Sequence, residues 1–322
     1  MTRRLPASHI SDAVTLLLAG KLVAFPTETV YGLGARADDT TAVGGIFAAK
    51  SRPQFNPLIV HVPDLAAANR IAKLNETAER LARSFWPGPL TLVLPLREQT
   101  TLSPLITAGQ SSVAVRVPSH PIALDLLRAV DVPLAAPSAN PSGKISATTA
   151  DHVIEGLGGR IDAVLDGGPC DVGLESTIIQ ADPLSLLRPG GIPPEKIEAV
   201  LSQPLAMPKL SGQSPIAPGQ LNSHYAPDCS VRLNARFRLA GEVFIGFGAQ
   251  PDATFNLSED ADLDEAAANL FAILHLANAA ALRQSAKAIA VAPIPAHGPG
   301  IAINDRLKRA AAPRSGVSAI GR

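Results

Sequence analysis

Polar side chains that could contact a ligand gather in short loops directly after apolar runs of this sequence. One such loop, residues 26–29 (Pro-Thr-Glu-Thr), follows the apolar residues 22–25, and Pro26 ends that predicted strand because it has no N–H for the sheet. Ligands of α/β proteins bind at strand ends, and Gly32 and Gly34 allow tight turning and close approach to a ligand. The loop therefore indicates a binding site, with a capped turn as the structural alternative.

Two cations stand two residues apart where a predicted helix gives way to a loop before Pro53. They are Lys50, a point charge, and Arg52, a bidentate fork. This combination suits phosphate oxygens. Cations at a helix C-terminus are also favourable without any ligand, so both interpretations stay open here.

A second polar loop, residues 137–143 (Pro-Ser-Ala-Asn-Pro-Ser-Gly), follows the predicted strand 134–136. Two prolines hold Ser138 and Asn140 in place, which suits a rigid contact to a ligand. An ordinary turn is equally compatible, because Asn, Pro and Ser are common in turns.

Two polar side chains, His61 and Arg116, stand inside apolar predicted strands. An unpaired buried charge is costly, so Arg116 needs a partner, either a structural carboxylate or a substrate carboxylate. His61 is more typical of a hydrogen-bonded core histidine than of a catalyst, and neither neighbourhood has metal-ligand spacing. No general-base constellation is visible, so chemistry here would rest on positioning and charge stabilisation.

The familiar nucleotide-binding signatures are not met. Residues 32–37 resemble G-x-G-x-x-A but lack the strand and helix that a Rossmann site needs, and residues 142–145 imitate the end of a P-loop with serine at 138 in place of glycine. A nucleotide would therefore bind by another route.

The elements that would position these loops alternate between helix and strand. Helices are predicted over 11–19, 41–50, 63–85, 121–130 and 194–201, and strands over 22–25, 58–62, 91–94, 113–117, 134–136, 163–166, 176–179 and 184–187. This alternation predicts an α/β fold with a twisted, open, mixed sheet and flanking helices. Strands at 243–247 and 288–291 with helices at 262–282 and 301–311 predict a smaller C-terminal α/β, Rossmann-like domain. We expect a catalytic domain over 1–203, a proline-rich linker over 204–227 and the small domain over 228–322.

The composition narrows the functional classes. Lys+Arg and Asp+Glu are equal at 28 each, so the overall charge does not indicate nucleic-acid binding. Cys170 and Cys229 stand alone and suit a reducing cytoplasm. The N-terminus lacks the apolar core of a signal peptide, and no apolar run reaches the length of a membrane span.

Together these stretches resemble the threonylcarbamoyl-adenylate synthase (YrdC-type) family in its long, two-domain form. Any one motif is weak, but their joint order is specific, and the similarity is dense over 20–195. The motifs lie at 26–33, 50–52, 56–61, 87–89, 116–118, 136–143, 175–178, 188–190 and 224–227.

The resemblance implies a reaction in which L-threonine, bicarbonate and ATP give threonylcarbamoyl-AMP and pyrophosphate. It implies that the product passes to a tRNA threonylcarbamoyl transferase complex, with Mg²⁺ accompanying ATP, a weak tRNA contact, a cytoplasmic location and no membrane. It assigns to L-threonine Thr29, His61, Arg116 and Ser176, and to ATP Lys50, Arg52, Asn56, Ser112, Ser138, Asn140, Ser146, Arg188 and Tyr225.

The linker is expected to close over ATP as a lid, with Tyr225 as its contact, because tyrosine joins an apolar ring to a hydroxyl. Residues 217–223 depart from the family, which more often has basic or bulkier residues before the His-Tyr pair at 224–225. The alternative function is a double-stranded RNA or tRNA-binding module that uses the same basic cavity, against which the neutral net charge and 4% aromatic residues weigh.

Overall fold

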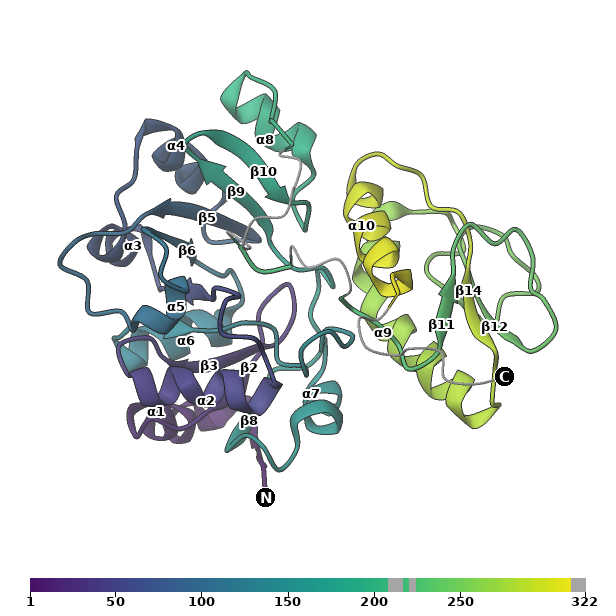
Figure 1. Ribbon diagram of the computed structural model, residues 1–322, viewed down its shortest axis with the longest axis horizontal. Coiled ribbons are helices and arrows are strands. Elements are labelled where there is room, and N and C mark those ends of the chain that lie inside the picture. Colours follow the sequence, from purple (N-terminus) through teal and green to yellow (C-terminus); the bar gives the residue numbers. More distant parts are fainter. Residues whose placement is uncertain (208–216, 220–223, 314–322) are drawn as a thin grey trace. The chain divides into compact units, whose positions relative to one another are not determined.

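The computed structural model describes residues 1–207, 217–219 and 224–313, and the chain divides into two compact units (Figure 1). The first unit comprises residues 1–142 and 146–220, and the second comprises residues 143–145 and 221–322. The sequence placed the linker over 204–227. In the structure Ala217 and Pro218 contact residues of the first unit, whereas Tyr225 and Ala226 contact residues of the second.

The first unit is built on one mixed sheet of ten strands in the order β1-β8-β2-β3-β7-β4-β6-β5-β9-β10. This confirms the predicted mixed α/β sheet. The strands are β1 (Arg3–Pro6), β2 (Val23–Phe25), β3 (Gly32–Arg36), β4 (Ile59–His61), β5 (Leu90–Pro95), β6 (Ser112–Arg116), β7 (Leu134–Ala135), β8 (Ala163–Asp166), β9 (Thr177–Ala181) and β10 (Leu184–Arg188).

Helices flank this sheet, and local sequence signals set their ends. Asp39 caps α2 (Thr40–Lys50) by accepting the N–H groups of Thr41 and Ala42, and Ser51 ends it in the left-handed conformation. The other helices of this unit are α1 (Ile10–Leu18), α3 (Leu65–Ile71), α4 (Glu76–Phe85), α5 (Pro104–Thr107), α6 (Pro121–Val130), α7 (Ala150–Leu157) and α8 (Pro194–Leu201).

The two faces of the sheet are covered differently. Alternate strand residues such as Val60 and Ala135 join the large core beneath α2, α3, α4, α5, α7 and α8. On the opposite face α1 and α6 cover Leu134 and Ala136. Further along that same face, Ile59, Val93, Ala114, Ile178 and Leu187 form a separate cluster, which contains Ala217 and no helical residue. We call this half of the face the open face because no helical residue belongs to its cluster, although its strand residues are each at most 7% exposed.

The second unit has a four-stranded, fully parallel sheet in the order β11-β14-β12-β13. Its elements are β11 (Ser230–Arg232), β12 (Glu242–Gly246), β13 (Phe255–Asn256), α9 (Leu263–Arg283), β14 (Ala288–Val291) and α10 (Pro299–Ala311). Among the described residues only α9 is long and apolar enough for a membrane span. Its residues Leu270, Phe271 and Leu274 are fully buried, which identifies it as a core helix.

The structure changes the interpretation of one glycine pair. Gly32 and Gly34 were expected to turn the chain toward a ligand, but both lie in β3, paired antiparallel with β2. A Cβ on Gly34 would stand 2.9 Å from Cε1 of Phe25. The glycine therefore makes room for an aromatic ring of the core rather than for a ligand.

Candidate active site

Four polar side chains stand in a row at one edge of the open face. His61 and Arg116 end the parallel strands β4 and β6 and are direct register partners. β5 runs antiparallel to β6 and β9 runs parallel to β5, so Thr91 and Ser176 reach the same edge from the starts of their strands. The Thr91 and Ser176 hydroxyls are 2.7 Å apart. Strand pairing therefore joins three of the four residues assigned to threonine, although 115 positions separate the first from the last.

Arg116 has a structural carboxylate partner, which answers the question left open by the sequence. Its Nη2 donates to Oε1 of Glu28 at 2.7 Å, its Nε donates to the Gly88 carbonyl at 3.3 Å, and Ser119 N–H donates to the second Glu28 oxygen at 3.1 Å. Both side chains are more than nine-tenths buried. Burial raises the pKa of Glu28, but the charge and hydrogen bond of Arg116 outweigh it and the net pKa is lowered. The Arg116 Nη1 has no partner among the described residues.

His61 is held neutral beside this pair. Burial, with Arg116 adding to it, lowers the pKa of His61 to about 3. Its ring meets that of Phe25 edge-on at 6.2 Å, and its buried Nδ1 has no hydrogen-bond partner within the described residues. Buried polar atoms are normally satisfied, so this nitrogen indicates a place where a ligand group would bond.

Thr29 lies in the loop between β2 and β3 and is fully buried. Its hydroxyl is 2.8 Å from that of Thr27, which also donates to the Val30 carbonyl at 2.7 Å. The two threonines thus fix the loop that delivers Glu28 to Arg116.

The cation pair at the end of α2 is buried rather than solvated. Lys50 is 1% exposed and its Nζ donates to the main-chain carbonyls of Ser138 and Asn140, which ties α2 to the loop after β7. Burial lowers the pKa of Lys50 well below its ordinary value, and the nearby Arg52 lowers it further. Arg52 donates to the carbonyls of Asn56 and Pro57. A buried lysine bonded to neutral carbonyls is electrostatically unfavourable until an anion arrives.

Asn56 and Ser146 are also brought to this region by short loops. Asn56 is buried, and its Oδ1 has no hydrogen-bond partner in the part of the chain that the structure describes. Ser146 is fully buried and donates to Glu175 at 2.6 Å. Glu175, like Glu28, therefore holds a site residue rather than standing alone as a base.

Arg188 links the end of β10 to the linker. Its Nη2 donates to the Ser176 carbonyl at 2.9 Å and to the Ser176 hydroxyl at 3.2 Å, and its Nη1 donates to the Pro218 carbonyl at 3.4 Å. The preceding Ala217 is fully buried in the cluster on the open face. Ala217 and Pro218 therefore contact the sheet beside Arg188.

Two predicted residues lie apart from these groups. Ser112 begins β6 on the same face as Arg116, four residues away, which is about 13 Å along a strand. Tyr225 belongs to the second unit, where its ring stacks on Phe271 at 5.4 Å and Arg306 lies 5.3 Å from its centroid. Its proposed contact with ATP stays a prediction.

Sequence reasoning assigned no role to three residues that hold the site, namely Glu28, Thr91 and Glu175. Their partners Arg116, Ser176 and Ser146 are 88, 85 and 29 positions away. Glu28 carried one usable signal, because it lies inside the loop that already suggested a ligand site.

Comparison with known proteins gives matches to both units. A family described as "Telomere recombination" matches residues 15–190, and "Threonylcarbamoyl-AMP synthase, C-terminal domain" matches residues 192–312. The threonylcarbamoyl-AMP synthase of Bacillus subtilis is 50% identical over 70% of this chain and 66% of its own length. That of Pyrococcus abyssi is 42% identical over 95% of both chains. The crystal structure of P. abyssi Sua5 complexed with L-threonine superposes with a TM-score of 0.87 at 39% identity over 97% of each chain.

Proposed function

Because this chain belongs to the threonylcarbamoyl-AMP synthase family, we propose that it converts L-threonine, bicarbonate and ATP into threonylcarbamoyl-AMP and pyrophosphate. One observation carries the proposal. The polar row around Arg116 lies at one edge of the open face, and the buried cations Lys50 and Arg52 lie at the end of α2 and just after it.

Threonine would bind at the row of His61, Arg116 and Ser176. Arg116 keeps Nη1 for the substrate carboxylate while Nη2 stays on Glu28. The neutral imidazole of His61 leaves its Nδ1 for a polar group of the ligand. The relative complexed with L-threonine supports an amino-acid site of this kind.

ATP would bind through Lys50, Arg52, Asn56, Ser138, Asn140, Ser146 and Arg188, with Ser112 toward the far end of β6. A triphosphate would give buried Lys50 an anionic partner in addition to its neutral carbonyl partners. The unbonded Asn56 Oδ1 would accept a hydrogen bond from a nucleotide donor. No group of three His, Cys, Asp or Glu residues able to hold a metal occurs among the described residues. Mg²⁺ would therefore arrive with ATP, bound by phosphate oxygens and water, and neutralise phosphate charge.

The chemistry follows from placing the reactants side by side. The threonine nitrogen forms a bond to the bicarbonate carbon and water leaves, which gives a carbamate. A carbamate oxygen then bonds to the α-phosphorus of ATP as the bond to pyrophosphate breaks. The buried cations would stabilise the charge that builds on the phosphates, and the linker around Ala217–Gly219 would exclude water, with Tyr225 closing over the nucleotide.

The burial of the cations weighs against the RNA-binding alternative. Lys50, Arg52, Arg116 and Arg188 are each at least 92% buried, whereas a nucleic-acid backbone needs cations on an accessible surface. We propose that the protein acts in the cytoplasm and that its product passes to a transferase that modifies tRNA.

The test is pyrophosphate release by the purified protein. Release should require threonine, bicarbonate and ATP together, and omitting any one should abolish it. Pyrophosphate release from ATP that ignores threonine would contradict the proposal. Threonine and ATP should also raise the melting temperature if both bind the native state.

A further inference from the structure

The loop between β11 and β12 presents cations and apolar side chains in alternation. Residues 236–239 read Arg-Phe-Arg-Leu, and all four are exposed. The Phe237 side chain is 62% exposed, the largest exposure of any aromatic residue among the described part of the chain. A single exposed apolar side chain is common on protein surfaces, so this ring is informative only together with the two arginines that flank it in the sequence.

This exposure is built into the loop rather than the result of a loose segment. Arg232 donates to both oxygens of Glu242 at 2.8 and 2.6 Å and to the Phe237 carbonyl at 3.0 Å. Leu239 N–H donates to the same carboxylate at 2.9 Å, and Ala235 is fully buried in the core. The loop is therefore anchored at both ends and at its middle, with Phe237 held outward.

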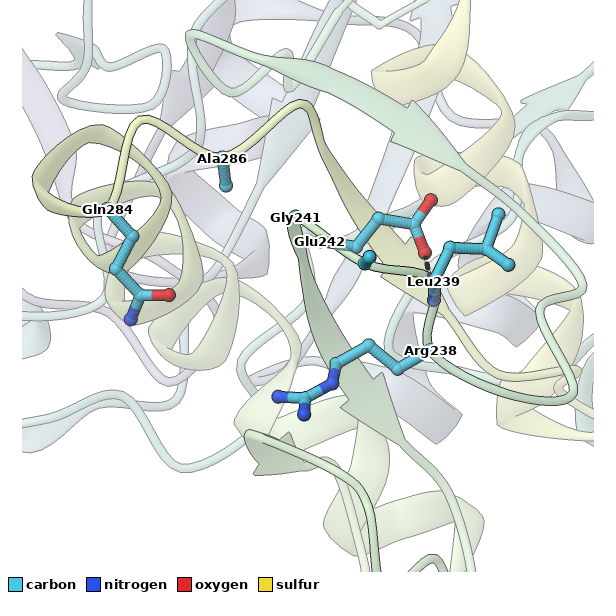
Figure 2. A pocket seen from close by; sticks show the side chains of 7 residues that line it. Arg238, Leu239, Gly241, Glu242, Gln284 and Ala286 are labelled. Carbon is cyan, nitrogen blue, oxygen red and sulfur yellow. Dashed lines mark hydrogen bonds between the residues drawn. The ribbon is translucent and has the colours of Figure 1, made fainter.

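A hollow of about 340 Å³ lies beside the loop (Figure 2). Its walls come from residues 238–242 and from Gln284 and Ala286 after the end of α9. Figure 2 shows that Arg238 and Gln284 come from separate segments, and that their side chains end in a guanidinium and an amide. Neither side chain has a hydrogen-bond partner among the described residues.

The charged side chains of residues 236–242 and 283–287 are mostly cations, and of them Arg238 and Glu242 line the hollow. Arg236, Arg238, Arg283 and Lys287 are exposed and have no ion-pair partner within the described residues. Lys287 joins this group because its N–H donates to the Gly241 carbonyl at 2.7 Å. The acids of this edge are already engaged, Glu242 by Arg232 and Asp228 by Lys144. Asp264, an acid of α9, lies at the other end of that helix, 19 residues before Arg283.

We propose that this surface of the second unit, formed by residues 236–242 and 283–287, binds an unpaired nucleic-acid strand. The four cations supply positive charge for the phosphates of a strand. Phe237 offers a face on which a base can stack, and such stacking needs a base that is not enclosed in a duplex. The hollow has room for one base, whose edge the Gln284 amide can both donate to and accept from. An acidic protein would match the cations but would leave the stacking face and the hollow without a purpose.

The measurement is fluorescence anisotropy of the full chain with a labelled single strand of about 12 nucleotides, as RNA and as DNA, against the matched duplex. Single strands should bind more tightly than the duplex, and the RNA and DNA arms distinguish which strand is preferred. With four phosphate contacts, the logarithm of the binding constant should fall against the logarithm of salt concentration with a slope of about −2.8. The double variant Arg236→Ala/Arg238→Ala should reduce that slope by about 1.4.

Matched variants separate this surface from general charge and from the active site. Lys21→Ala/Lys196→Ala removes two exposed cations of the first unit and should leave binding unchanged. Phe237→Leu should weaken binding at least fivefold, and Phe237→Tyr should restore it, because stacking needs a ring. All of these variants should keep wild-type pyrophosphate release, so failure of the synthase proposal would be seen separately.

Three outcomes would overturn the proposal. One is an equal loss of affinity in the Lys21→Ala/Lys196→Ala control. Another is unchanged affinity for single strands in Phe237→Leu. The third is binding of poly-glutamate as tight as that of the strand, which would identify a site for acidic proteins instead.

Discussion

Replacing Glu28 by glutamine should show how much of the stability of the first unit depends on one buried ion pair. The change keeps the size of the side chain but removes its charge, so Arg116 stays buried at 4% exposure without a counter-ion. Removing one partner of a buried pair costs about 3–5 kcal/mol. The glutamine oxygen can still accept from Arg116, whereas its amide nitrogen cannot accept the Ser119 N–H. We therefore expect a loss near the lower end, about 3 kcal/mol at neutral pH.

The assay can isolate the first unit because the chain has one tryptophan, Trp86. Its indole donates to the Leu90 carbonyl at 2.7 Å, so its fluorescence during urea denaturation reports that unit. The double variant Glu28→Gln/Arg116→Met should recover most of the lost stability, since no charge is then left unpaired. Threonine affinity should not recover in the double variant.

The pH dependence of the free energy of unfolding tests the same ion pair. The pKa of Glu28 lies below its ordinary 4.5 in the folded protein, so the pair contributes fully above 4.5 and its contribution is lost as pH falls through the lower folded value. The gap between wild type and Glu28→Gln should therefore shrink in acid. A gap that is equally wide at about pH 7 and about pH 3, or wild-type stability of Glu28→Gln, would refute the reasoning.

Other perturbations test the substrate contacts. Lys50→Ala and Arg52→Ala should weaken ATP binding by at least about tenfold, more at low salt, while threonine affinity measured by calorimetry changes little. Arg116→Ala should abolish threonine binding, and Arg116→Lys should rescue it only in part because lysine cannot form a fork. Because the pKa of His61 is about 3, threonine affinity should show no step near pH 6.5, and such a step that disappears in His61→Gln would contradict the assignment. Tyr225→Ala should weaken ATP binding more than Tyr225→Phe, and equal effects would leave the hydroxyl and ring without distinct roles.

The sequence predicted the elements whose signals are local. Pro26 ends β2 and α2 stops where Pro53 approaches, both from properties of neighbouring residues. It did not predict β3, because the glycines that admit the Phe25 ring look like turn residues until the strand beside them is known. It also joined α3 and α4 into one helical stretch, although the Asn75 cap at the start of α4 was visible.

The residues of the candidate site also divide into those that the sequence indicated and those that it did not. Arg116 stood out because a cation between valines is unusual in sequence, and Lys50 stood out because it is two residues from Arg52 at the end of a predicted helix. The groups that hold them did not, since the pairing of Glu28 with Arg116 arises from a loop crossing to a distant strand. Which carboxylate meets which guanidinium is a property of register and loop path, and both are decided by tertiary packing.

The short stretch Gly143–Ile145 makes the second unit depend on a segment that lies far from residues 221–322 in the sequence. Gly143 accepts the Ala226 N–H at 2.8 Å and Lys144 pairs with Asp228 at 2.6 Å, although both flanks of the stretch belong to the first unit. A gene fragment that encodes only residues 221–322 would omit these partners, so the second unit is not a cassette that recombination could add or remove with one cut. Its gain or loss in evolution would also have to reshape the loop that carries Asn140 and Ser146. During synthesis, more than 70 further residues must be added after this loop before its partners leave the ribosome. The first unit can therefore begin to fold before the second unit is complete.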